Sequence, residues 1–201
     1  MLKIGLTGGL ACGKSFVGEA LASYGCYLIR ADELGHEALA RGGTAFEPAV
    51  AEFGLDILDP AGEIDRRRLA ARVFGDAEAL ARLNRLVHPA VQRREEQLMA
   101  EFRAREPQGI AVVEAAILIE NGRYKNFDRL ILVTCSEEQQ VARAIHRGGL
   151  DEAEVRARLS RQMPLAEKRK FADFVIDTSG AKQETLRQTR AVYETLRRIE
   201  I

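Results

Sequence analysis

The sequence lacks several features that would place the protein in a specialised class. Its 30 basic and 30 acidic residues balance to no net charge, so no overall field favours nucleic acid or an anionic membrane. No apolar run approaches the roughly 18 residues that a membrane span needs. The amino terminus lacks a basic region followed by a long apolar segment, so we expect no export signal. These absences predict a soluble cytoplasmic protein that binds neither nucleic acid nor membrane.

Cysteine is also scarce. The three cysteines, Cys12, Cys26 and Cys135, form no C-x-x-C pair, and their number is odd. Scattered thiols of this kind are more typical of a reducing compartment than of a disulfide framework. The length of 201 residues and the hydrophobic content of 46% are sufficient for one good-sized core. The composition therefore predicts one globular domain, residues 1–201.

Five short apolar runs predict β-strands. The runs are nearly continuous rather than alternating, as expected for strands that are buried on both faces. Helical patterns separate them, which favours a parallel α/β sheet with helices on both faces. The predicted strands are Leu2–Thr7, Cys26–Arg30, Ile110–Ile119, Arg129–Cys135 and Phe174–Asp177.

A long helical insertion is predicted between the second and third strands, at about 33–106. Asp76 is expected to cap a helix within it. The pair His88–Pro89 is then expected to interrupt that helix, because a residue before proline is disfavoured in the α region. A new helix would begin with Pro89 in its first turn. The insertion therefore reads as helices without a strand.

A second excursion from the sheet, at about 137–172, is dense in arginine. Gly148 is expected near a helix end and Asp151 at the start of the next helix. The chain closes with a helix that carries Val192, Leu196 and Ile199 on one face. The arginines of the excursion are Arg143, Arg147, Arg156, Arg158, Arg161 and Arg169.

The segment from Gly8 to Ser15, GGLACGKS, matches the pattern G-x-x-x-x-G-K-[ST] between a predicted strand and a predicted helix. Glycines let the backbone approach an anion with its N–H groups turned inward. Lys14 would reach the β- and γ-phosphates, and the Ser15 hydroxyl is a ligand for Mg²⁺. The following helix directs its positive end to the same place. The pattern predicts a phosphate loop, in which Cys12 is interpreted as a small residue that fits rather than as a redox-active group.

A phosphate loop serves several enzyme classes, and the sequence favours a kinase over a GTPase. The stretch DPAG at Asp59–Gly62 matches D-x-x-G, but it lies in the helical insertion and reads as a turn. No N-K-x-D occurs in the sequence. Asp32 directly follows the second strand, at the edge where ligands of open α/β sheets bind, although it could also be a helix N-cap. The arginine-dense segment would supply positive charge and exclude water if it closes as a lid.

Several segments, taken in order, are similar to one known family. They are IGLTGGLACGKS, ADELGHEAL, FGLDILDPAGEIDRRRLAARVF, LNRLVHPAV, AAILIE, QQVARAIHRGGL and RLSRQMPLAEKRKFADFVIDTSG. Together they resemble the bacterial dephospho-coenzyme A kinases over nearly the whole chain. No segment beyond the loop is diagnostic alone, but their order and spacing are specific.

The resemblance implies a P-loop kinase with a core, a helical substrate-binding region and an arginine-rich lid. It implies transfer of the γ-phosphoryl group of ATP, with Mg²⁺, to the 3′-hydroxyl of dephospho-CoA, the last step of coenzyme A synthesis. Asp32 would orient or deprotonate that hydroxyl, Arg147 would reach the ATP phosphates, and His88 would lie near the substrate. Glu114 would organise Mg²⁺ with Ser15. The implied ATP contacts are Gly8, Gly9, Ala11, Cys12, Gly13, Lys14, Ser15 and Phe16.

The sequence departs from the family pattern at four positions. Arg30 replaces the first Asp of Asp-Ala-Asp, Glu114 stands where Asp is common, Ala116 replaces Pro, and Thr178 replaces an Asn near the expected adenine site. Two alternatives stay open: a nucleoside or nucleotide monophosphate kinase of similar architecture, and a nucleotide-dependent regulatory protein without transfer activity. We expect a monomer, with an oligomer left open.

Overall fold

The structure, a computed structural model, describes residues 1–73, 75–148 and 151–199. The chain divides into two compact units. The first comprises Met1–Arg30 with Phe102–Ile201, and the second is Ala31–Glu101. The second unit therefore overlaps most of the predicted helical insertion. Among the described residues, no helix combines the length and apolarity needed to cross a bilayer.

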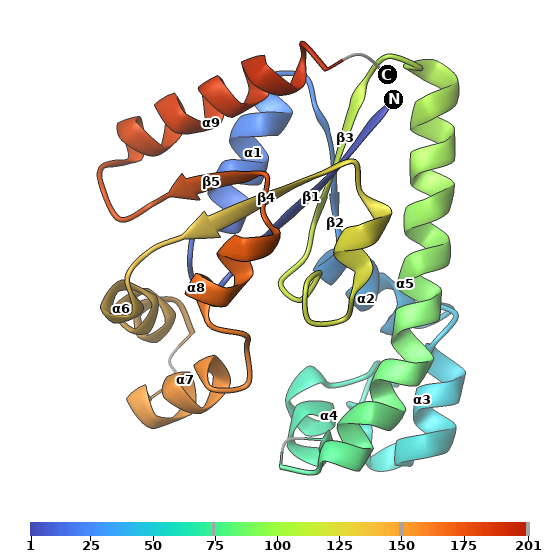
Figure 1. The fold of residues 1–201 in the computed structure, drawn as a ribbon. Coiled ribbons are helices and arrows are strands. Elements are labelled where there is room, and N and C mark those ends of the chain that lie inside the picture. The colour runs from blue at the N-terminus through green and yellow to red at the C-terminus, as the bar shows by residue number, and fades with distance from the viewer. Residues whose placement is uncertain (74, 149–150, 200–201) are drawn as a thin grey trace. The chain divides into compact units, whose positions relative to one another are not determined.

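The first unit is built on a five-stranded parallel sheet (Figure 1), which confirms the predicted α/β fold class. The strand order is β2-β3-β1-β4-β5, so β1 lies at the centre and its loop is flanked on both sides. All five predicted strands are present. They are β1 (Leu2–Gly8), β2 (Tyr27–Arg30), β3 (Ile110–Glu114), β4 (Arg129–Thr134) and β5 (Phe174–Asp177).

The third strand ends earlier than predicted, and the predicted range Ile110–Ile119 is wrong in its second half. β3 stops at Glu114, and the chain then turns, with the N–H of Asn121 donating to the carbonyl of Ile117. Leu118 is nevertheless completely buried. An apolar run reports burial, and burial in a turn cannot be distinguished from burial in a strand by periodicity alone.

Helices α1 (Lys14–Ser23) and α9 (Lys182–Leu196) lie side by side and cover the sheet (Figure 1). Apolar side chains of both helices and of the strands form the main core. Ile199, expected on the last helix, lies beyond the end of α9 but still packs against this core. The remaining helical segments of this unit are α6 (Glu137–Gly148), α7 (Glu152–Leu159), α8 (Leu165–Lys168), η2 (Arg123–Asn126) and η3 (Arg169–Phe171).

The predicted start of α7 is confirmed. The Asp151 carboxylate accepts a hydrogen bond from the N–H of Glu154 at 2.8 Å, and the Glu154 carboxylate accepts one from the N–H of Asp151 at 3.3 Å. Such a reciprocal capping box satisfies two N–H groups that the helix itself leaves unpaired. The predicted glycine end of α6 falls on Gly148, and residues 149 and 150 lie outside the described part of the chain.

The second unit is helical, as predicted, and has an apolar core of its own. The DPAG segment is a turn, as expected: the Asp59 carboxylate accepts hydrogen bonds from the N–H groups of Ala61 and Glu63, and Gly62 has a φ of 78°. The helical segments are α2 (Ala31–Leu39), α3 (Phe46–Phe53), η1 (Leu55–Ile57), α4 (Arg66–Val73) and α5 (Ala77–Arg105), whose last turn belongs to the first unit.

The predicted break at His88–Pro89 is wrong. Asp76 caps α5 as expected, but the helix continues through Pro89 to Arg105. An internal proline costs about 3 kcal/mol because it removes one hydrogen bond and crowds the preceding turn. Apolar side chains pack on both sides of Pro89: Ala79 lies in one apolar cluster of the second unit and Ala90 lies in another. This packing, which local sequence preference does not report, holds the helix continuous.

Candidate active site

The loop between β1 and α1 has the backbone conformation of an anion-binding site. Ala11 and Gly13 both have positive φ angles, of 55° and 84°. Alternation between left- and right-handed residues turns successive N–H groups toward one concavity. Because Gly13 directly precedes α1, this concavity lies at the positive end of that helix.

The two glycines at the start of the loop are required for a different reason: neighbouring atoms leave no room for a side chain at either position. A Cβ atom on Gly8 would overlap the carbonyl oxygen of Val133 on β4. A Cβ atom on Gly9 would lie 2.7 Å from Oε1 of Gln140 and 3.0 Å from Sγ of Cys12. The loop is therefore packed closely against the neighbouring strand and against α6, and its path is fixed by contact.

Lys14 folds back over the beginning of the loop. Its Nζ atom donates hydrogen bonds to the carbonyl oxygens of Gly9 at 2.9 Å and Gly8 at 3.3 Å. The side chain is half-buried, so the ammonium group combines positive charge with restricted mobility. A cation held in this way is suited to bind a phosphate group that enters the loop.

Glu114 and Arg30 form one arrangement with Ser15. The Ser15 hydroxyl donates a hydrogen bond to Oε1 of Glu114 at 2.8 Å, and Nε of Arg30 lies 3.8 Å from Oε2 of Glu114. Arg30 and Glu114 are register partners at the ends of the neighbouring parallel strands β2 and β3. Positions 30 and 114, at both of which the sequence departs from the family pattern, are thus in contact. The Arg30 guanidinium lies beside the Glu114 carboxylate, whose side chain is longer than the common Asp.

The oxygen atoms beside the loop fit a magnesium ion. Mg²⁺ bound together with phosphate takes one or two protein oxygens, because it retains waters and phosphate oxygens as its other ligands. Ser15 and Glu114 supply a hydroxyl and a carboxylate of this kind. In the described part of the chain, no group of three or more His, Cys, Asp or Glu side chains is arranged to hold a metal ion.

Thr178 holds the loop from the other side. Its hydroxyl donates a hydrogen bond to the carbonyl oxygen of Cys12, 2.8 Å away, and accepts one from Nη1 of Arg143 at 3.0 Å. Nη2 of Arg143 also donates to the Thr178 carbonyl oxygen at 2.7 Å. Arg143, which reads as one arginine of a solvated helix, is therefore half-buried and braces the loop through Thr178.

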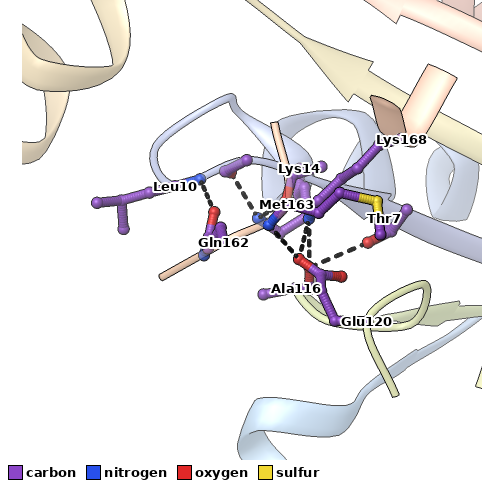
Figure 2. A network of polar contacts seen from close by, with 10 residues as sticks. Thr7, Leu10, Lys14, Ala116, Glu120, Gln162, Met163 and Lys168 are labelled. Carbon is purple, nitrogen blue, oxygen red and sulfur yellow. Dashed lines mark hydrogen bonds and ion pairs between the residues drawn. The ribbon is translucent and has the colours of Figure 1, made fainter. Parts of the chain in front are cut away.

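A polar network contacts the beginning of the loop (Figure 2). The sequence did not predict its central residue, Lys168. The Lys168 side chain is completely buried, with Nζ 2.8 Å from Oε1 of Glu120 and 3.2 Å from the carbonyl oxygen of Ala116. The hydroxyl of Thr7, the residue before the loop, donates to the same Ala116 oxygen at 3.2 Å. Lys168 lies in a charged run of the sequence that is typical of a solvated surface. Its role in the network is therefore recognised only from its burial in the structure.

The same network reaches the segment that follows α7. The side-chain oxygen of Gln162 accepts a hydrogen bond from the N–H of Leu10 at 3.0 Å, and Oε1 of Glu120 accepts one from the N–H of Met163 at 3.3 Å (Figure 2). Leu10 also packs beside the apolar cluster of α6 and α7. Residues 162–168 are thus bonded both to the phosphate loop and to the turn after β3.

The other predicted site residues are placed as follows. Arg147 is exposed in the last turn of α6, and Phe16 is half-buried, with Nζ of Lys182 5.9 Å from its ring centre. Asp32 is exposed as the second residue of α2, so it is not the N-cap, and His88 is exposed within α5. The structure brings Lys14, Ser15 and Glu114 together in the first unit. Asp32 and His88 belong to the second unit, so their part in this site stays a prediction.

Sequence comparisons agree with this geometry. A model of the dephospho-CoA kinase family matches residues 2–184 of the chain. The dephospho-CoA kinase of Aquifex aeolicus (strain VF5) is 41% identical over 198 residues, which cover 98% of this chain and 99% of that relative. The dephospho-CoA kinase of Geobacillus kaustophilus (strain HTA426) is 40% identical over 193 residues, covering 95% and 94%.

Solved structures give the same result. The crystal structure of TT1252 from Thermus thermophilus superimposes with a TM-score of 0.81 and 34% identity, covering 97% of each chain. The dephospho-CoA kinase from Campylobacter jejuni superimposes with a TM-score of 0.65 and 26% identity, covering 96% of each chain. The family model and the relatives match nearly the whole chain, and the structure has a phosphate loop on a parallel sheet. The chain therefore belongs to the dephospho-CoA kinase family.

Proposed function

We propose that the protein transfers the γ-phosphoryl group of ATP to the 3′-hydroxyl of dephospho-CoA and so completes coenzyme A synthesis. The observation that carries this proposal is the phosphate loop, with Lys14 folded over it and Ser15 beside Glu114, in a chain of this family. Phosphoryl transfer requires little covalent chemistry from the protein, so positioning and electrostatic stabilisation must supply most of the catalysis.

On this proposal the first unit binds the donor. The inward N–H groups of the loop and the Lys14 ammonium stabilise the negative charge of the β- and γ-phosphates. Ser15 and Glu114 would hold Mg²⁺, which neutralises charge on the transferred group when it is bound. Arg147, exposed in the proposed lid of about 137–172, would add positive charge and help to exclude water. The proposed ATP contacts are Gly8, Gly9, Ala11, Cys12, Gly13, Lys14, Ser15, Phe16 and Arg147.

The second unit would bind the acceptor. It contains a cavity of 380 Å³ with apolar walls from α4 and α5, including Leu69 and Leu83, and with the polar side chains of His36 and Arg66. A site of this composition suits a ligand that has both apolar and charged parts. The exposed Asp32 carboxylate would orient the 3′-hydroxyl, and His88 would contribute on the substrate side.

A coupled assay for ADP formation tests the function directly. Mg-ATP is offered with dephospho-CoA, AMP, CMP, UMP or dTMP in turn, and the product is identified by mass. We expect ADP only with dephospho-CoA, together with 3′-phosphorylated coenzyme A. Turnover with a nucleoside monophosphate would show that the proposed acceptor is wrong, while the P-loop kinase fold would still hold. ADP formation that needs no acceptor would favour a nucleotide-dependent regulatory protein.

Asp32→Asn is expected to lower kcat about 10²-fold or more while ATP affinity stays close to that of the wild type, because a positioned acid acts on the acceptor hydroxyl. Glu33→Gln is the matched control, since it removes a neighbouring exposed carboxylate from the same helical turn. Steady-state kinetics and ATP titration distinguish the two variants. Equal kcat values in Asp32→Asn and the wild type would remove Asp32 from the mechanism.

Glu114→Gln is expected to raise the Mg²⁺ concentration needed for half-maximal activity about tenfold, because an amide oxygen is a weaker ligand for a hard cation than a carboxylate. Glu19→Gln is the control: Glu19 also contacts Arg30, at 3.4 Å, but it is exposed. Activity is measured over a Mg²⁺ titration at saturating ATP. An unchanged Mg²⁺ requirement in Glu114→Gln would show that Glu114 does not hold the metal.

A further inference from the structure

Two of the three cysteines meet at the phosphate loop. The sulfur atoms of Cys12, in the loop, and of Cys135, at the end of β4, are 3.5 Å apart and hydrogen-bonded. The two residues are far apart in the sequence and come together because β4 lies directly beside β1. Cys12 therefore has a chemical neighbour that its position in the loop pattern does not reveal.

The two sulfur atoms differ in their environment. Cys12 has no exposed surface, whereas Cys135 is 8% exposed and lies on the wall of a cavity of 600 Å³ that also contacts Gly9 and Gln140. The hydrogen bond with Cys12 lowers the pKa of Cys135, and the positive charge of Arg143 acts in the same direction. Hydrogen bonding to Cys135 and burial raise the pKa of Cys12. Cys135 is thus the more reactive thiol and the one that a small reagent can reach.

Cys26 provides an internal comparison. It is 7% exposed, about as much as Cys135, and burial raises the pKa of its thiol to about 12. Burial and a raised pKa slow the reaction of such a thiol with a reagent from solution, and this holds for Cys12 as well. Cys12 differs from Cys26 because a second sulfur atom, that of Cys135, lies 3.5 Å away. The same chain therefore contains a pair of cysteines arranged to react with each other and a third cysteine that is not.

We propose that Cys12 and Cys135 are a site of reversible oxidation, at which a peroxide closes a disulfide between the phosphate loop and the end of β4. The Cys135 sulfur attacks one oxygen of the peroxide, so that an S–O bond forms, the O–O bond breaks and the other oxygen leaves as water. The Cys12 sulfur then attacks the Cys135 sulfur, and the S–O bond breaks as the S–S bond forms. The proton of Cys12 leaves with the oxygen as a second water.

The reaction balances without further components. Two thiols and one hydrogen peroxide give one disulfide and two waters, and the two sulfur atoms together lose two electrons. Reduction by a dithiol reverses the change. Because an S–S bond is about 2.05 Å long, the sulfur atoms must approach by about 1.5 Å from their present distance of 3.5 Å.

This movement acts on a part of the loop whose backbone is already constrained. Cys12 lies between Ala11 and Gly13, the two residues with positive φ, and its carbonyl oxygen is held by Thr178. Moving its sulfur toward β4 distorts the N–H groups that, on the proposed function, bind the triphosphate. Misplacement by about 1 Å can cost a hundredfold in rate, so oxidation is expected to inactivate transfer to about that extent.

The experiment uses the full-length protein with hydrogen peroxide as the probe. Free thiols are counted after denaturation, and linked peptides are identified by mass. We expect three free thiols before treatment and one afterwards, with Cys12 linked to Cys135 and Cys26 free. Dithiothreitol should restore both the thiols and the transfer activity. Three remaining thiols, a link through Cys26, or Cys135 oxidised to the sulfinic acid without a link would each overturn the proposal.

Two variants separate the pair from general damage. Cys135→Ser keeps a hydrogen-bonding group in place and should retain basal activity but resist inactivation by peroxide, whereas Cys26→Ala should form the disulfide and lose activity like the wild type. Equal inactivation of Cys135→Ser and the wild type would contradict the proposal. Disulfide formation is scored by mass, so it can be established even if transfer to dephospho-CoA is not observed, in which case the proposed function alone fails.

Discussion

Lys14→Ala is expected to reduce kcat/KM for phosphoryl transfer about 10²–10³-fold, equivalent to about 3–4 kcal/mol of transition-state stabilisation. The Lys14 ammonium is half-buried and held 2.9 Å from the Gly9 carbonyl oxygen, so its charge is already positioned before phosphate binds. Preorganised charge of this kind is stronger than charge that must reorganise during the reaction. Initial-rate kinetics with Mg-ATP and dephospho-CoA measure the effect.

The control for Lys14→Ala is Lys182→Ala. Lys182 is a cation beside the ring of Phe16, near the start of α1, and it has no hydrogen bond to the loop carbonyls in the described structure. A much smaller decrease is expected for this variant, because a solvated cation contributes little. Similar losses in both variants would mean that the overall positive charge near α1 matters rather than the position of Lys14. Thermal melts verify that both variants are folded.

Lys168→Met is expected to lower the free energy of unfolding by about 3–5 kcal/mol. The side chain of Lys168 is completely buried, and its ammonium group lies 2.8 Å from the Glu120 carboxylate, which is itself only 20% exposed. Removing the cation leaves a partly buried carboxylate without its ionic partner, and it also removes a hydrogen bond from the Ala116 carbonyl oxygen. Urea denaturation followed by circular dichroism measures the change.

Lys170→Met is the matched control for Lys168→Met. Lys170 pairs with Glu167 at 2.6 Å, a shorter distance than in the buried pair, but both members of this pair are exposed. An exposed ion pair contributes about 0–1 kcal/mol to the free energy of unfolding. The loss of stability should therefore depend on the burial of the pair rather than on its N–O distance. The double variant Lys168→Met/Glu120→Leu should recover much of the lost stability, since neither charge then remains buried alone. Equal losses for Lys168→Met and Lys170→Met would refute the structural role of Lys168.

The features predicted correctly from sequence are those encoded by local patterns. The continuous apolar runs locate the five strands, the spacing of glycines and Lys14 locates the phosphate loop, and Asp151 and Asp76 mark helix starts through their own side chains. Each of these signals depends on residues within a few positions of one another. Local patterns are therefore sufficient for the fold class and for the position of the loop between β1 and α1.

The features that were missed depend on contacts between distant segments. Helix α5 continues through Pro89 because apolar clusters hold both of its halves in the second unit. The burial of Lys168 and the contact between Cys12 and Cys135 join segments that lie far apart in the sequence. No window of the sequence contains both members of such a pair. Strand order, which decides these contacts, became available only with the structure.

The contact between Arg30 and Glu114 couples the effects of substitutions at these two positions. The Arg30 side chain is 32% exposed, whereas that of Glu114 is 10% exposed. The Glu114 carboxylate is held by the Ser15 hydroxyl and lies beside the Arg30 guanidinium, so loss of the cation at position 30 would leave a largely buried acid with one partner fewer. The effect of either substitution thus depends on the other, which is epistasis between register partners on adjacent strands.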